Sequence, residues 1–175
     1  MKGDFFSDLA FGKAIEKQLT RMLPGYTVNY HSNGEFDLSK GDINVEVKAD
    51  RYYASKFLFI EKYGDKETKK PGGPFRAYED DPNSELIYVV VNEYTSSITE
   101  VYIFKTTDLY LRCSELIESG EYLPIGKPNT TYTTIGYLIP KSEFLDIAIV
   151  IKPQESKIPK QKKAKTNLNY QEDDI

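Results

Sequence analysis

An unbroken apolar run at residues 86–92 (LIYVVVN) constrains the fold of this chain more than any other segment. Runs of this kind are typical of a central strand that is buried within a sheet. A turn at residues 95–97 and an alternating segment at residues 99–105 follow it, which predicts that the two strands form a hairpin. The sequence therefore predicts a sheet with a buried centre.

The remaining segments give both helix and strand signals. Residues 4–23 carry apolar side chains at three- and four-residue steps before Pro24-Gly25, which predicts an amphipathic helix. A second helix is predicted at residues 107–119, with Thr107 as its N-cap and Gly120 after its end. Strands are predicted at residues 26–30, 35–38, 43–49, 58–63, 131–138 and 147–151, and a polar loop at residues 64–74. The expected fold class is α+β, a mixed sheet flanked by helices.

The composition fits a single domain. A chain of 175 residues is long enough for one core, predicted at residues 1–153, and the lysine-rich, then acidic residues 154–175 are predicted to be a disordered tail. The single cysteine, Cys113, excludes an internal disulfide and is predicted to pack in the core. Neither a membrane span nor a signal-peptide core is visible. We therefore expect no membrane partner and a cytoplasmic location, in a host cell if the source is viral.

Charged side chains alternate with apolar ones in the strand predicted at residues 43–49. Because successive side chains of a strand point to opposite faces, Glu46 and Lys48 share one face, roughly 6–7 Å apart, and Val47 faces the other way. Asp37 lies nine residues before Glu46, in the facing strand of a predicted hairpin whose turn is residues 39–42. A short turn of this kind brings Asp37 beside Glu46.

Two adjacent carboxylates repel each other unless a cation neutralises them. Magnesium prefers oxygen ligands and typically takes one or two carboxylates together with water and a substrate phosphate. Such a metal lowers the pKa of a bound water and stabilises charge on the phosphate, while Lys48 can orient the water. The pattern therefore has the parts for phosphodiester hydrolysis, although a solvated strand face with a surface ion pair is the alternative. Bound cations would also let a chain of net charge −4 accept DNA.

The first predicted helix adds Glu16 to this group. Glu16 follows Gly12 by four residues and precedes Leu19 by three, so it shares their otherwise apolar face. A carboxylate on that face needs a partner, because burying an unpaired charge is costly. Glycine is also unfavourable in mid-helix, by about 1 kcal/mol relative to alanine. A close approach between helix and sheet would explain Gly12 and would bring Glu16 to the metal.

Three short segments resemble the ordered motifs of the PD-(D/E)xK nucleases, the restriction-endonuclease-like superfamily. They are residues 12–16 (GKAIE), 36–38 (FDL) and 45–48 (VEVK), all within the first third of the chain. The resemblance is closest to the small phage, viral and archaeal members that are like Holliday-junction resolvases. The sequence departs from the family pattern at Phe36, where the nominal motif has proline.

The resemblance implies a restriction-endonuclease-like core and a magnesium-dependent DNA endonuclease, with Mn²⁺ as a substitute metal and branched DNA among the expected substrates. It makes Asp37, Glu46 and the Val47 carbonyl the metal ligands. Glu16 would be the helical acid that supports the metal site, and Lys48 the catalytic lysine. Resolvases of this family typically act as symmetric dimers, so the resemblance also raises a homodimer as an expectation.

Further charged residues are candidate DNA contacts. Arg51, Lys56 and Arg76 are candidates for binding phosphates, and Glu61 lies where related nucleases often carry another polar active-site residue. The alternative for each of them is an ordinary charged surface residue. Some tyrosines could stack on exposed bases or serve as core material, namely Tyr52, Tyr53, Tyr63 and Tyr78.

Two other functions stay open at this stage. One is a non-catalytic DNA-binding protein that keeps the nuclease fold as a scaffold. The other is a protein-interaction module in which the charged cluster is a surface ion pair.

Overall fold

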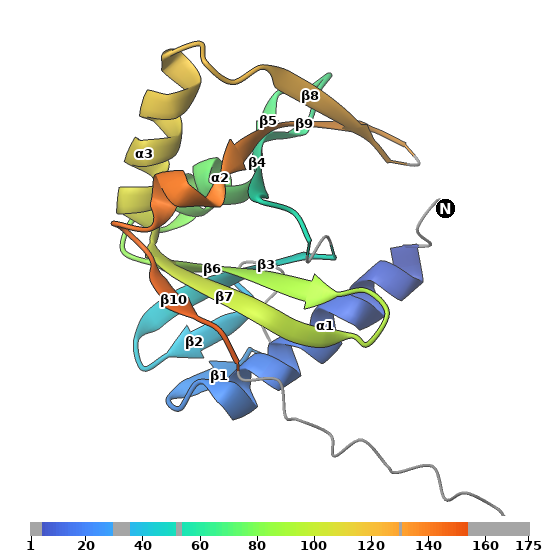
Figure 1. The fold of residues 1–175 in the computed structure, drawn as a ribbon, viewed down its shortest axis with the longest axis vertical. Helices are drawn as coiled ribbons and strands as arrows, with labels where there is room; N and C mark the ends of the chain where they lie inside the picture. The colour runs from blue at the N-terminus through green and yellow to red at the C-terminus, as the bar shows by residue number, and fades with distance from the viewer. Residues whose placement is uncertain (1–4, 30–35, 52–53, 130, 154–175) are drawn as a thin grey trace, which may run out of the picture.

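The computed structural model describes residues 5–29, 36–51, 54–129 and 131–153, which are coloured in Figure 1. Its helices are α1 (Phe5–Met22), α2 (Gly73–Asp80), α3 (Thr106–Glu118) and the short 3-10 helix η1 (Lys141–Phe144). Its strands are β1 (Tyr26–Val28), β2 (Leu38–Lys40), β3 (Ile43–Asp50), β4 (Phe57–Asp65), β5 (Lys70–Pro71), β6 (Glu85–Asn92), β7 (Ser97–Lys105), β8 (Pro124–Pro128), β9 (Thr133–Pro140) and β10 (Ile149–Ile151). The α+β class is confirmed.

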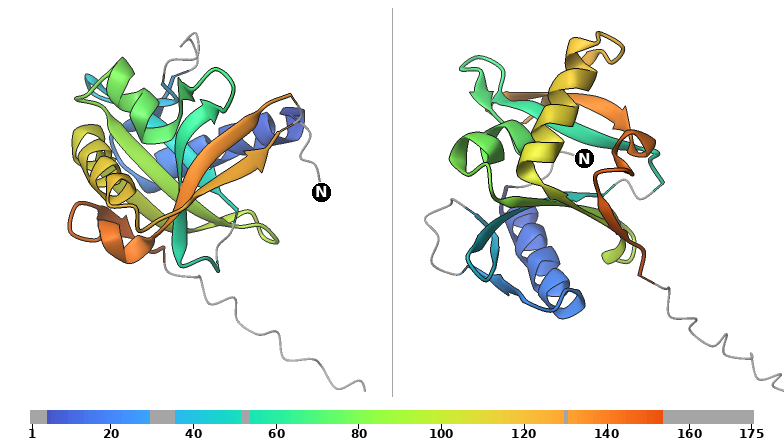
Figure 2. Two further views of the ribbon diagram at one scale, coloured as in Figure 1. Left: turned by 90° about the horizontal axis from the view of Figure 1, so that it is seen from above. Right: turned by 90° about the vertical axis from the view of Figure 1, so that its left-hand side faces the viewer.

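The strands form two sheets where one mixed sheet was expected. The larger has the order β1-β2-β3-β6-β7-β10, and β3 and β6 are its parallel pair. The smaller is antiparallel and has the order β5-β4-β9-β8. The helix α1 covers one face of the larger sheet, whereas α2, α3 and the smaller sheet lie over the opposite face (Figures 1 and 2).

Strand β6 is buried on both sides, as the apolar run predicts. Leu86, Tyr88 and Val90 point into a core shared with α2, α3 and the smaller sheet. The alternate residues of the strand, among them Ile87 and Val89, point into a second core shared with α1. A continuous apolar run suits this position because the strand has no solvated face.

The hairpin that carries Asp37 is shifted from the prediction. Strand β2 is Leu38–Lys40, not residues 35–38, so the turn is shortened to Gly41 and Asp42. Gly41 has φ of 60°, a left-handed conformation that glycine adopts without a steric penalty. Asp37 consequently lies just before β2 and not in the middle of a strand.

Three elements were missed in the sequence, namely β5, α2 and β8. Residues 64–74 were predicted as a loop, but they contain the end of β4, the strand β5 and the start of α2. Helix α2 begins at Gly73 without a side-chain cap and carries a proline in its first turn, where a missing N–H costs nothing. Strand β8 is exposed along its whole length, so it shows no alternation of apolar and polar residues.

The predicted capping role of Thr107 is wrong. Helix α3 has Lys105 as its N-cap with no side-chain cap bond, and the Thr107 hydroxyl instead donates to the Pro82 carbonyl at 2.6 Å. Gly120 follows the helix end with φ of 74°, as its position predicts. The predicted core position of Cys113 is confirmed, since its side chain is fully buried.

Within the described ranges, no helix is both long and apolar enough to cross a membrane. The predicted tail at residues 154–175 lies outside the described residues, as do Tyr30, Glu35, Tyr52 and Tyr53.

Candidate functional site

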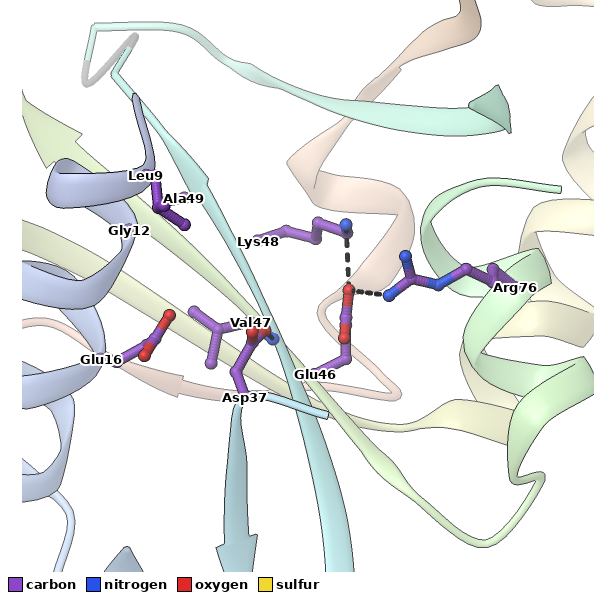
Figure 3. A pocket seen from close by; sticks show the side chains of 9 residues that line it. All are labelled: Leu9, Gly12, Glu16, Asp37, Glu46, Val47, Lys48, Ala49 and Arg76. Atoms are coloured by element: carbon purple, nitrogen blue, oxygen red, sulfur yellow. Dashed lines mark hydrogen bonds and ion pairs between the residues drawn. The ribbon is translucent and has the colours of Figure 1, made fainter. Parts of the chain in front are cut away.

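A cavity of about 300 Å³ opens where α1, the start of β2, β3 and α2 meet. All the residues predicted to be catalytic line it, although they come from separate elements (Figure 3). The lining residues are Leu9, Gly12, Glu16, Asp37, Glu46, Val47, Lys48, Ala49 and Arg76. The fold therefore brings the constellation seen in the sequence together in one place.

Asp37 is held by the main chain on either side of it. Its N–H donates to the Val45 carbonyl at 3.1 Å, and its carbonyl accepts the Asn29 N–H at 3.0 Å. Its carboxylate Oδ2 accepts the Val47 N–H at 2.8 Å. These bonds fix both the backbone and the side chain of Asp37 beside β3.

The Asp37 carboxyl lies in an unfavourable environment for a negative charge. Burial raises its pKa above the usual value, and the negative charge of Glu46 raises it further. The Val47 hydrogen bond and the positive charges of Lys48 and Arg76 oppose this shift without cancelling it. The carboxylate is thus short of positive charge even though two cations lie nearby.

Glu16 reaches the same cavity from α1. Figure 3 shows its side chain extending from the helix toward Asp37. Burial raises the pKa of the Glu16 carboxyl, and the charge of Asp37 is the next largest cause, ahead of a smaller rise from Glu46. Lys13 acts in the opposite direction. Glu16 therefore lines the same cavity as Asp37 and Glu46, the position that the helical spacing predicts.

The explanation predicted for Gly12 is wrong. We expected the backbone of α1 to approach the sheet too closely for a side chain. Instead, a Cβ added at Gly12 would meet only Oε1 of Glu16, at an ordinary contact distance of 3.9 Å. Gly12 lines the cavity, so its missing side chain leaves open space beside the Glu16 carboxylate.

Glu46 is the most enclosed acid of the cluster, with 4% of the residue exposed. Its Oε1 accepts bonds from Nζ of Lys48 at 3.0 Å and from Nη2 of Arg76 at 2.6 Å, which Figure 3 shows as dashed lines. Lys48 extends from the same face of β3 as Glu46, as the strand alternation predicts. A buried carboxylate requires this kind of compensation, because an unpaired charge away from water is strongly unfavourable.

The pairing of Arg76 with Glu46 was missed in the sequence, because the helix that carries Arg76 was predicted as a loop up to Pro74. One signal was present: Arg76 and Asp80 are four residues apart, a spacing that places them on one helix face. Nε of Arg76 lies 3.7 Å from Oδ2 of Asp80.

The other candidate DNA contacts divide into two groups. Arg76 lines the cavity, and Glu61 lies next to it, with Oε2 4.0 Å from Nζ of Lys48. The guanidinium of Arg51 instead lies over the Phe11 ring at 4.1 Å. Lys56 is exposed just before β4 and lines neither this cavity nor the one beside it.

The tyrosines predicted as possible stacking residues are placed only in part. Tyr78 stacks against Tyr110 with the ring centroids 4.0 Å apart, so one face of its ring is covered. Tyr63 lies in β4, with Nζ of Lys62 5.6 Å from its ring centroid.

The side chains around the cavity offer the type of ligand atom that a hard divalent cation prefers, namely oxygen. Carboxylate oxygens of Glu16, Asp37 and Glu46 are the ligands that magnesium prefers, and their mutual repulsion would fall when a cation binds. Across the residues that the structure describes, no group of three or more acidic, histidine or cysteine side chains is already gathered at metal-binding distance. Glu46 points instead to Lys48 and Arg76, so it would have to turn toward Asp37 to join such a group.

Comparison with known proteins adds no relative to this picture. No protein-family model matches the chain, and no curated protein matches it.

Proposed function

We propose that this protein is a metal-dependent nuclease that hydrolyses phosphodiester bonds in DNA, on a restriction-endonuclease-like core. One observation carries the proposal: Glu16, Asp37, Glu46 and Lys48 line the same cavity, although they come from a helix, the segment just before β2, and β3. A structural ion pair needs one acid and one base. Here additional acids have been drawn together at the cost of repulsion, which favours a site built for a cation.

In this proposal Glu16, Asp37, Glu46 and the Val47 carbonyl hold Mg²⁺, with Mn²⁺ as a substitute. The bound metal supplies positive charge for the phosphate and lowers the pKa of a water molecule. Lys48 lies beside Glu46 and can orient that water toward the phosphorus. The Val47 N–H keeps the Asp37 carboxylate in a fixed orientation, since it donates to Oδ2 at 2.8 Å.

Arg76 has two roles in this scheme. Without a ligand it neutralises the buried Glu46 carboxylate. Its guanidinium, which carries several donors in one plane, can bind a phosphate as readily as a carboxylate. If Glu46 bound a cation, the Arg76 guanidinium would become available to a substrate phosphate in the same cavity.

The test is a cleavage panel of duplex, single-stranded, flapped and four-way DNA with Mg²⁺, run for the parent and for Asp37→Asn. The asparagine keeps an oxygen that can accept the Val47 N–H but removes the charge. The matched control is Asp42→Asn, which makes the same change in the exposed turn of the same hairpin. We expect cleavage by the parent and by the control, and a loss of more than about 100-fold in Asp37→Asn, beyond the usual cost of an outer-shell change. Equal cleavage by all three proteins would contradict the proposal.

A non-catalytic DNA-binding protein is the second candidate, because Lys48 and Arg76 already compensate Glu46 without any metal. The same panel separates the two functions. Binding of DNA by the parent with no cleavage in Mg²⁺ or Mn²⁺ would favour this second function.

A further inference from the structure

A second cavity, of about 390 Å³, adjoins the proposed metal site. Lys48 and Arg76 line both cavities, so the two spaces meet at these side chains. The residues that line the second cavity are Lys48, Glu61, Gly64, Asp65, Lys70, Pro71, Gly72, Gly73, Arg76 and Tyr132. Its volume lies within the range of small-molecule sites, about 300–1,000 Å³.

Two glycines that line this cavity lie directly against β4. Gly72 and Gly73 pass so close to β4 that a Cβ at Gly72 would lie 2.6 Å from Cγ of Glu61. Gly73 has φ of 47° and would place a Cβ 3.0 Å from the Glu61 carbonyl oxygen. These contacts fix Glu61 against the glycines, on the side that faces Lys48. The absence of side chains at Gly72 and Gly73 therefore makes room for Glu61 at the edge of the cavity.

Tyr132 enters the lining from the smaller sheet, just before β9. Its carbonyl accepts the Asn129 N–H at 2.8 Å, and the next residue, Thr133, accepts the Lys66 N–H at 2.8 Å through its carbonyl. The backbone that carries Tyr132 is thus attached to the far end of β4, which borders the cavity. Tyr132 is 48% exposed as a residue, so an aromatic surface is available to a ligand.

The charges of the lining suit a phosphate group. Lys48, Lys70 and Arg76 contribute three positive charges against the two acids Glu61 and Asp65. Both carboxylate oxygens of Asp65 accept bonds from its own turn, from the Glu67 N–H and the Thr68 hydroxyl. Lys48 and Arg76 lie at the junction of the two cavities, where both contact Oε1 of Glu46, and Lys70 lines the second cavity only.

We propose that the second cavity binds the nucleotide next to the scissile phosphate, with its base stacked on Tyr132 and its phosphate near Lys70. This inference rests on the proposed nuclease function and names its substrate class. A base inside a duplex has both faces covered by its neighbours, so only an unpaired nucleotide can offer a face to Tyr132. The preferred substrate is therefore DNA with an unpaired strand at the cleavage position.

The test measures the affinity of oligothymidylate and of a blunt duplex for the parent, Tyr132→Ala and Tyr132→Phe, in Ca²⁺ in place of Mg²⁺ to prevent cleavage. The matched control is Tyr94→Ala, which removes an exposed tyrosine from the turn between β6 and β7. We expect Tyr132→Ala to weaken binding of the single strand about tenfold, as loss of one stacked base typically does. Tyr132→Phe, which keeps the ring, and Tyr94→Ala should bind like the parent, and duplex affinity should not change.

Cleavage of a flapped DNA in Mg²⁺ separates the inference from the function on which it rests. If the parent cleaves DNA but Tyr132→Ala binds the single strand as tightly as the parent, the second cavity is not a nucleotide site and the nuclease function stands. A loss in Tyr132→Phe equal to that in Tyr132→Ala also overturns the inference, because stacking does not need the hydroxyl. If the parent cleaves no DNA, the proposed function itself fails.

Discussion

Two groups of charged residues on the larger sheet show opposite electrostatics. On β7, the Glu100 carboxylate accepts bonds from Lys141 at 2.7 Å, Lys152 at 3.2 Å and the Tyr102 hydroxyl at 2.9 Å. Although burial acts in the other direction, these donors hold the pKa of Glu100 below its usual value. Around the candidate site, burial and neighbouring acids raise the pKa values of Glu16 and Asp37 instead.

The difference separates a structural ion cluster from a candidate active site. In the Glu100 cluster the carboxylate is already paired with two lysines and a tyrosine hydroxyl, so a bound cation is not needed to compensate its charge. The cavity between α1 and β3 leaves two carboxylates in conflict, which a bound cation would relieve. Carboxyl pKa values raised by burial and by neighbouring acids in a cavity mark a candidate functional site, whereas a pKa lowered by paired cations accompanies stabilisation of the fold. The following predictions test this contrast.

The largest difference in cleavage rate is expected between substitutions of Lys48, in the candidate site, and of Lys141, in the Glu100 cluster. Lys48→Ala should lower the rate of DNA cleavage about 10²–10⁴-fold, the range typical for a group that assists proton transfer. Lys141→Ala, which removes the partner of Glu100, should leave the cleavage rate within a small factor of the parent. Single-turnover cleavage with excess enzyme measures both. A comparable loss of rate in the two variants would remove the distinction between the clusters.

Neutralising the two acids should change stability in opposite directions. A carboxyl whose folded pKa is lowered stabilises the fold above its unfolded pKa, so Glu100→Gln should reduce the free energy of unfolding at pH 7 by about 1–3 kcal/mol. A carboxyl whose folded pKa is raised destabilises the fold at high pH, since the free energy of unfolding falls as the pH rises from the unfolded to the folded pKa. Asp37→Asn should therefore stabilise the metal-free protein at pH 7 by about 0.5–2 kcal/mol.

Urea denaturation at pH 7 and again near pH 3 checks this pair of variants. The difference between Asp37→Asn and the parent should shrink at the lower pH, where the carboxyl binds its proton. A destabilised Asp37→Asn at pH 7 would show that its hydrogen bond outweighs the repulsion.

Divalent cations should distinguish the clusters by ligand-induced stabilisation. At a Mg²⁺ concentration ten times the dissociation constant, the parent should gain about 1.4 kcal/mol, measured as a rise in Tm. Glu100→Gln should show the same gain, and Asp37→Asn should show none. A rise in all three proteins would indicate non-specific binding of the cation.

The smallest effect concerns the wall of the cavity. Gly12→Ala should stabilise α1 by about 0.4–1 kcal/mol, because the added methyl group has only an ordinary contact with Glu16. Gly73→Ala is the contrasting variant, expected to destabilise because of its positive φ and the nearby Glu61 backbone. Thermal unfolding measures both, and a destabilised Gly12→Ala would show that the cavity is tighter than this geometry indicates.

The sequence predicts what depends on local periodicity. The alternation in β3 places Glu46 and Lys48 on one face, and helical spacing turns Glu16 toward the sheet. The unbroken apolar run predicts β6 because a strand covered on both sides needs no polar residues. These features are readable because neighbours in the chain are also neighbours in space.

The missed features depend on contacts between distant segments. Arg76 meets Glu46 across 30 residues of sequence, on a helix that begins with Gly-Pro and has no capping side chain. Strand β8 is an exposed edge, so burial leaves no pattern in it. Tyr132 reaches the second cavity because β9, which it directly precedes, pairs with β4. Contacts between such distant segments leave no local pattern in the sequence, so they could not be predicted from it.

The parallel pairing of β3 with β6 has a consequence for the order of folding. Parallel neighbours cannot be joined by a tight turn, so residues 51–84 form a long crossover that includes β4, β5 and α2. Closing such a loop loses chain entropy before the pairing can compensate for it, which slows folding. Glu46 lies before the crossover and Arg76 within it, and the two meet only once it has closed. We therefore expect the candidate site to be assembled late, because a nascent chain that ends before β6 lacks the strand that pairs with β3.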